Sequence, residues 1–132
     1  MQGTVHDNFG IAFSRKTGRV LIYKATLRAL GLPEYVRLLP NPKWRKLALQ
    51  VCAKEETGAI RIPKSKSKCK PIIICSLVIQ RMLWDMCSWE KNGNYRVYGR
   101  YFPKNEIVEF CLSDAEDIPD ELFIDPECTL TP

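Results

Sequence analysis

The chain has 132 residues, of which 45% are hydrophobic and 27% are charged. This length suits a single domain, and the hydrophobic fraction is that of a globular protein, which excludes a disordered chain. The longest uncharged apolar stretch, residues 71–80, covers about half of the ~20 residues that a membrane helix needs. Because no signal peptide is recognisable at the N-terminus, we expect a cytoplasmic protein.

The net charge of +5 is unevenly distributed along the chain. Residues 1–70 contain fifteen lysines and arginines and four acidic residues, whereas residues 113–132 contain seven acidic residues and no base. A basic body attracts polyanions such as nucleic acids, although basic residues also keep small domains soluble. We expect the segment 113–132 to be a flexible, solubilising acidic tail; the alternative is that it folds back on the basic face.

The first predicted elements are short and separated by turns. Residues 9–13 and 19–23 are β-prone, and they flank a turn in which Gly18 can adopt a positive φ. Residues 25–30 predict a helix of two turns at most, which Gly31 ends.

Two further strands are predicted at 35–39 and 46–52, because a proline-containing turn separates these two apolar runs. Residues 59–62 alternate in character and stop at a proline, which favours an edge strand. Residues 64–70 carry lysine at every second position and have no apolar periodicity, so they predict a basic, exposed loop.

The longer helix is predicted over 77–88, with one apolar face that would lie on the sheet. Residues 95–102 and 106–112 then form the clearest hairpin, in which Gly99 indicates a bulge or a close approach by another backbone. The predicted apolar face of the helix consists of Val78, Ile79, Met82, Leu83 and Met86, and the other side carries Gln80, Arg81 and Asp85.

Strands dominate this order, and the long helical crossovers of a parallel sheet are absent from it. We therefore predict one α+β domain over residues 1–112, with a mainly antiparallel, partly barrelled sheet and one short and one longer helix. Both halves of the domain contain a helix followed by a hairpin, but no residue-level repeat is apparent between them.

Catalytic chemistry is poorly supported by the sequence. The one histidine, His6, is close to the N-terminus and cannot complete a Ser-His-Asp or Cys-His set, and the glycines are scattered as turn residues. The six cysteines include no C-x-x-C pair, so we expect small hydrophobic thiols rather than zinc ligands. We therefore predict a non-enzymatic protein with no metal and no cofactor.

The second hairpin and one turn combine cations with aromatic rings. One face of the strand 95–102 carries Arg96, Tyr98 and Arg100, a mixture that can hold phosphates and stack on bases. The simpler alternative is that the other face, Tyr95, Val97 and Tyr101, packs on the helix while the arginines pair with Glu106 or Glu109. Trp44 follows Lys43 and precedes Arg45 at a turn, where it either stacks on a base or folds onto the sheet.

The run from Thr17 to Gly31 reads T-G-R-V-L-I-Y-K-A-T-L-R-A-L-G. With the two strands after it, this region, residues 9–50, resembles the AbrB/MazE/SpoVT swapped-hairpin domain of bacterial regulators and antitoxins, although Tyr23 stands where that family has proline. The resemblance implies an intertwined homodimer that binds DNA through basic residues of the first loop and short helix. The whole chain also resembles small proteins of clostridial bacteria and their mobile elements.

From charge and resemblance together we expect a small nucleic-acid-binding protein, a DNA-binding transcriptional regulator of the swapped-hairpin kind. The alternative is a non-enzymatic accessory protein of a mobile element or phage, which inhibits a host defence protein or sequesters a small anionic signal. The expected nucleic-acid-binding residues are Arg15, Lys16, Arg19, Arg28, Lys64, Lys66, Lys68, Lys70, Arg96 and Arg100.

Overall fold

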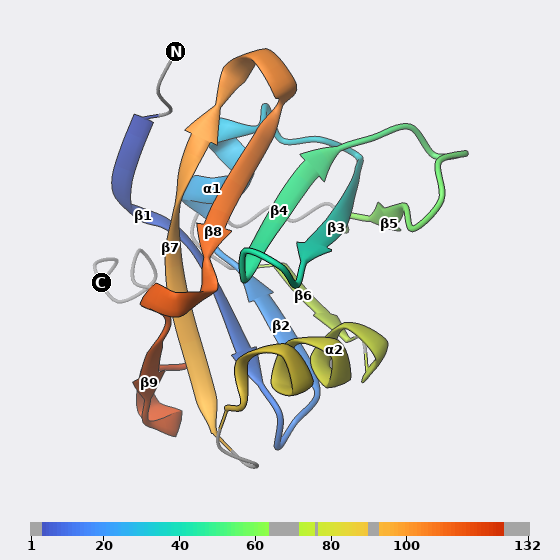
Figure 1. Cartoon of the computed structure of the whole chain (residues 1–132). Helices are drawn as coiled ribbons and strands as arrows, with labels where there is room; N and C mark the ends of the chain where they lie inside the picture. The colour runs from blue at the N-terminus through green and yellow to red at the C-terminus, as the bar shows by residue number, and fades with distance from the viewer. Residues whose placement is uncertain (1–3, 64–71, 76, 90–92, 126–132) are drawn as a thin grey trace.

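Figure 1 shows the computed structural model of the chain, which describes residues 4–63, 72–75, 77–89 and 93–125. The strands are β1 (Thr4–Ser14), β2 (Arg19–Ile22), β3 (Tyr35–Asn41), β4 (Lys46–Val51), β5 (Ile60–Arg61), β6 (Ile72–Cys75), β7 (Asn94–Phe102), β8 (Ile107–Cys111) and β9 (Glu116–Ile118). The helices are α1 (Lys24–Ala29) and α2 (Leu77–Cys87), with short 3-10 turns at η1 (Pro103–Asn105), η2 (Leu112–Asp114) and η3 (Asp120–Leu122).

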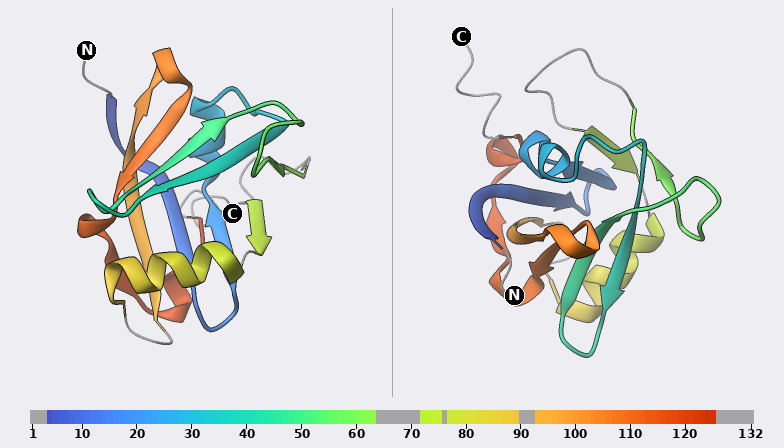
Figure 2. Two further views of the ribbon diagram at one scale, coloured as in Figure 1. Left: turned by 45° about the vertical axis from the view of Figure 1, so that its right-hand side comes forward. Right: turned by 90° about the horizontal axis from the view of Figure 1, so that it is seen from above.

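The strands form one curled antiparallel sheet in the order β5-β3-β4-β8-β7-β1-β2-β6, with β9 added beside β7. Its curvature makes a half-barrel, which is plain when the molecule is seen from above (Figure 2). The predicted sheet-rich α+β class is therefore confirmed. Strands β6 and β9 are additions that the sequence pattern does not predict.

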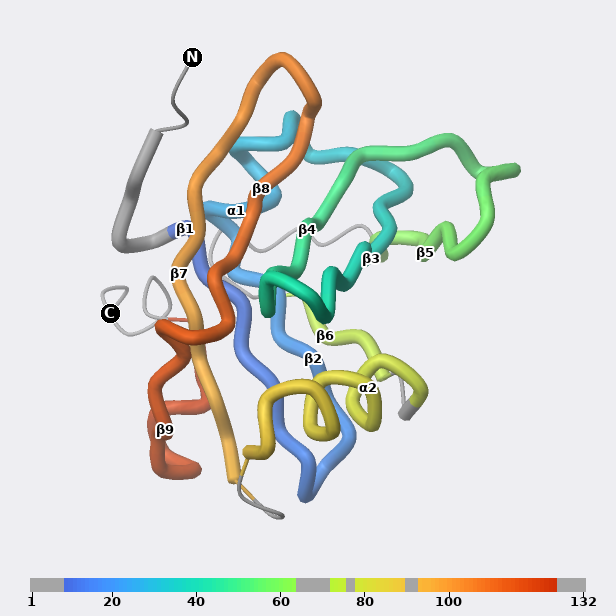
Figure 3. The backbone as a smooth tube through the Cα atoms, in the orientation of Figure 1, coloured from blue at the N-terminus to red at the C-terminus, as the bar shows by residue number. Residues whose placement is uncertain are grey.

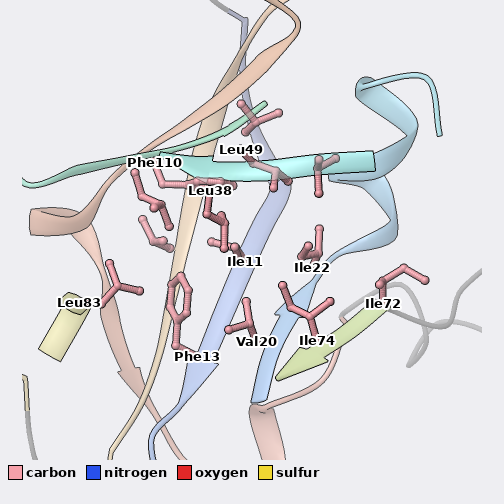
Figure 4. Packing of buried hydrophobic residues seen from close by; sticks show 14 of the residues in the cluster. Ile11, Phe13, Val20, Ile22, Leu38, Leu49, Ile72, Ile74, Leu83 and Phe110 are labelled. Carbon is pink, nitrogen blue, oxygen red and sulfur yellow. The ribbon is translucent and has the colours of Figure 1, made fainter. Parts of the chain in front are cut away.

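The concave side of the sheet holds the main core, because alternate residues of each strand point inward. On β1 these are Ile11 and Phe13, and on β4 they are Leu47 and Leu49, all of them fully buried. Figure 4 shows how this cluster closes, with Ile11, Phe13, Val20, Ile22, Leu38, Leu49, Ile72, Ile74, Leu83 and Phe110 labelled.

Helix α2 covers one end of this core with aromatic side chains. Trp89 stacks on Tyr95 of β7 with 4.5 Å between the ring centroids, and Trp84 meets Trp89 edge-on at 4.9 Å. The simpler interpretation of the inner face of β7, packing against the helix, is thus confirmed for Tyr95. Val97 is also buried, at 1% exposure.

The buried side of α2 differs from the predicted one. Val78 is 72% exposed, although the pattern places it on the apolar face. Gln80 is instead fully buried, beside Leu83 and Trp84. The helix is therefore rotated relative to the expectation, and a buried amide takes a place in the interface.

Most of the strand pairs in one half of the chain have an equivalent pair in the other half. The hairpin β3–β4 corresponds to the hairpin β7–β8, and the pairing of β1 with β7 corresponds to that of β5 with β3. In the pairs β2–β6 and β4–β8, a strand of one half pairs with its own equivalent in the other half. The pairing of β1 with β2 has no counterpart between β5 and β6 among the described residues. The path of both hairpins can be followed in Figure 3.

The correspondence extends to single residues of the two hairpin turns. The Arg45 N–H donates to the Pro42 carbonyl at 3.3 Å, and the Glu106 N–H donates to the Pro103 carbonyl at 3.3 Å. Arg45 and Glu106 both have left-handed backbones, with φ of 50° and 53°. At the crossing of the hairpins, the Val51 N–H donates to the Glu106 carbonyl at 3.1 Å and the Leu112 N–H to the Arg45 carbonyl at 2.9 Å. The two halves are therefore related residue by residue in backbone geometry here, although their sequences show no matching repeat.

The acidic C-terminal segment belongs to the fold as far as the structure describes it. Glu116–Ile118 pairs with β7, and Asp125 is buried at 1% exposure. An Asp125 carboxylate oxygen accepts a hydrogen bond at 2.7 Å from the N–H of Lys24, the first residue of α1. This carboxylate caps the start of a helix that has no side-chain cap of its own. The expectation of a flexible tail is therefore wrong for residues 113–125.

The same segment covers a second, smaller cluster on the other side of the sheet. This cluster comprises Ala12, Leu21 and Tyr23, with Tyr98 and Phe123 packed against it. The sheet is thus buried on both faces where β1, β2 and β7 lie together, and the acidic segment supplies the outer cover.

Candidate nucleic-acid interface

The β1–β2 turn presents three of the expected basic residues at one end of the molecule. The Gly18 N–H donates to the Ser14 carbonyl at 2.8 Å, and the φ of 72° at Gly18 is one that glycine adopts without strain. This tight turn leaves Lys16 and Arg19 exposed and Arg15 half-buried. The basic end of the hairpin therefore follows directly from the sequence of the turn.

Gln80 of α2 holds this turn through hydrogen bonds to its backbone carbonyls. Its Nε2 donates to the Arg19 carbonyl at 2.9 Å and approaches the Ser14 carbonyl at 3.5 Å, so that one buried amide spans both ends of the turn. The next residue along α2, Arg81, is exposed. Neither Gln80 nor Arg81 is among the sequence-predicted site residues, because an amphipathic pattern assigns both to a solvated helix face.

The β3–β4 turn lies near the other end of the same helix. Burial raises the pKa of the Cys87 thiol at the end of α2, and the positive charge of nearby Arg45 partly opposes this shift. Trp44 is 63% exposed, and the Lys43 ammonium lies 5.5 Å from the centroid of its ring. Figure 1 shows α2 between the β1–β2 turn and the β3–β4 turn.

We call this region the basic end. Acids border it as well, since Asp85 is on α2, Asp114 on η2, Glu116 and Asp117 on β9, and Glu121 on η3 beside Asp120, which lies 3.8 Å from the Lys16 ammonium. That ion pair is largely exposed and therefore weak. The cations of the basic end are Arg15, Lys16, Arg19, Lys43, Arg45 and Arg81.

Arg96 is not a free cation, because its charge is paired with an acid of the C-terminal segment. Its guanidinium forms an ion pair with the Glu116 carboxylate at 2.8 Å, and it lies 5.5 Å from the centroid of the Tyr98 ring. Burial alone would lower the pKa of Arg96, but Glu116 and Tyr23 raise it above the ordinary value. The predicted pairing of Arg96 with Glu106 or Glu109 is wrong, because its acidic partner, Glu116, comes from β9.

The remaining expected residues are separated from the basic end. Arg28 is in the last turn of α1, which follows β2, whereas the β1–β2 turn precedes that strand. Arg100 is exposed on β7, opposite Glu109 of β8 in the strand register. Lys64, Lys66, Lys68 and Lys70 lie outside the described residues.

A cavity of about 450 Å³ opens on a different side, between α1 and the start of β6. Leu27, Leu32 and Ile62 give it apolar walls, and among the described residues its charged lining consists of Lys24 and Glu34.

Other chemistry receives no support from the residues described. They contain no group of three or more histidine, cysteine or acidic side chains that is placed to hold a metal ion. The described cysteines, Cys52, Cys75, Cys87 and Cys111, are free thiols, of which Cys75 is exposed and the other three are partly buried. Among the helices in the described ranges, none has the length and apolar character to cross a membrane.

Searches against protein-family models, curated proteins and solved structures found no match to this chain.

Proposed function

We propose that this chain is a small DNA-binding protein, a regulator of the swapped-hairpin kind, and that its basic end contacts the DNA backbone. The observation that carries the proposal is the convergence of cations from three separate segments around α2. Arg15, Lys16 and Arg19 come from the β1–β2 hairpin, Arg81 from helix α2 and Arg45 from the β3–β4 hairpin. Such a surface suits phosphate groups, which supply most of the non-specific affinity of DNA-binding proteins.

The salt dependence of binding tests this proposal. Each neutralised phosphate releases counterions, so contact with about four phosphates should lower the affinity roughly a hundredfold between 50 and 200 mM salt. We expect a gel shift of a random-sequence duplex to show this loss. Circular dichroism at both salt concentrations serves as the control that the fold is unchanged. Absent binding, or binding that ignores salt, would reject the proposal and favour the accessory-protein alternative.

We further propose that one chain takes the place of the intertwined dimer that the resemblance implies. The support is the equivalence of the two halves, since β1 of the first half pairs with β7 of the second and β4 pairs with β8. The hairpins thereby find their neighbours within one chain. We expect the purified protein to elute as a monomer in size-exclusion chromatography with light-scattering detection. A stable dimer at micromolar concentration would show that the pairing runs between chains.

A further inference from the structure

The two hairpin turns allow a comparison within one molecule. Both begin with the pair Pro-Lys, at Pro42 and Pro103, and both place a residue of positive φ three positions after the proline. Both close with the same hydrogen bond of 3.3 Å onto the proline carbonyl. The backbone therefore places the same demands on both turns.

The side chains that these turns carry are different. Trp44 and Arg45 of the first turn correspond to Asn105 and Glu106 of the second. Since Asn105 and Glu106 fulfil the same turn geometry, the geometry requires neither an indole nor a guanidinium. Packing does not require the indole either, because Trp44 is 63% exposed.

The surroundings of Trp44 define the chemistry of a partner. Lys43 lies over one side of the ring, 5.5 Å from its centroid, and Arg45 follows in the chain. The nearest acid on the neighbouring strand, Glu109, is already paired with Lys46 at 3.3 Å. An exposed indole with a lysine over one face suits a flat ring that carries a negative charge nearby, which describes a nucleobase and its phosphate.

We propose that the β3–β4 turn is a stacking site for an unpaired base of single-stranded nucleic acid. The site would work beside the phosphate contacts of the basic end, so this inference rests on the proposed function. Stacking on Trp44 would favour single strands over duplex, because a base within a duplex has its faces covered.

The test compares a single-stranded 12-mer with the duplex of the same length, by fluorescence anisotropy at 50 mM salt. The variant W44N replaces Trp44 by asparagine, the residue found at the equivalent position of the β7–β8 turn. We expect it to weaken single-strand binding about tenfold while duplex binding stays within twofold. W44F keeps a ring and should retain most of the single-strand affinity. N105W tests the equivalent turn and should change neither affinity.

The outcomes separate this inference from the proposed function. If wild type binds the duplex and W44N binds single strands as wild type does, the stacking site is wrong and the proposed function stands. An equal loss for both ligands would also overturn it, because stacking is then not what Trp44 provides. If wild type binds neither ligand, the proposed function fails together with the stacking site, and the turn is left as a surface for a protein partner.

Discussion

Reversing the three charges of the β1–β2 turn, in the variant R15E/K16E/R19E, is expected to weaken duplex binding at 50 mM salt by at least a hundredfold. Each substitution removes an attraction to phosphate and adds a repulsion at the same place. The fold should tolerate the change, since Lys16 and Arg19 are exposed and the turn depends on Ser14 and Gly18. Anisotropy titration with a labelled random duplex measures the effect.

The matched control is K54E/R61E/K104E, which changes the net charge of the chain by the same amount. These three residues are exposed in the β4–β5 connection, in β5 and in η1, away from the β1–β2 turn (Figure 1). We expect the control to weaken binding less than tenfold, through the long-range field alone. Equal losses in the two variants would mean that net charge, and not the basic end, governs binding.

Replacing Gly99 by alanine is expected to destabilise the fold by about 3 kcal/mol, the upper part of the usual range for overpacking. A Cβ on Gly99 would lie 2.6 Å from the Glu109 carbonyl oxygen and 2.8 Å from a ring carbon of Phe110. The first contact is with the backbone of the paired strand β8, which cannot move without disturbing the hairpin. Urea unfolding gives the difference in the free energy of unfolding.

Gly58→Ala provides the comparison for this effect. Gly58 has a φ of 81° and no atom within 4 Å of its added Cβ, so its substitution reports backbone strain alone, about 1 kcal/mol. If Gly99→Ala unfolds no more easily than Gly58→Ala, the close approach of β8 is not as tight as described.

The elements with strong local patterns are those that the sequence predicts well. The two turns at Gly18 and Pro42, the short helix and the β7–β8 hairpin all appear close to their expected positions. Gly99 also meets the expected close approach of another backbone. In each case the deciding interactions are local in sequence, so that residue types and spacing are sufficient.

The features that the sequence does not reveal depend on contacts between distant segments. Strand β9 forms because Glu116 meets Arg96 and because β7 has a free edge there, and neither fact is visible in an acidic run. The carboxylate of Asp125 caps helix α1 at Lys24, which is 101 residues earlier in the chain. The burial of Gln80 likewise depends on the two carbonyls of the β1–β2 turn.

The repeat is hidden for a similar reason. Helix α1 has 6 residues and α2 has 11. The sequence distance between equivalent strands that precede the helices therefore differs from the distance between equivalent strands that follow them. An alignment of the two halves without a gap therefore fails. Only the pairing of the strands identifies Pro42 with Pro103 and Val51 with Leu112.

A titration of the ¹⁵N-labelled full chain with a short random duplex, followed amide by amide by NMR, tests most directly whether DNA contacts the basic end. We expect the largest shift changes at residues 14–19 and 41–46 and at Arg81, with the second hairpin turn at 103–106 unaffected. Changes centred instead on Arg28 and Arg100, or on the turn at 103–106, would contradict the assignment of the interface to the surface around α2.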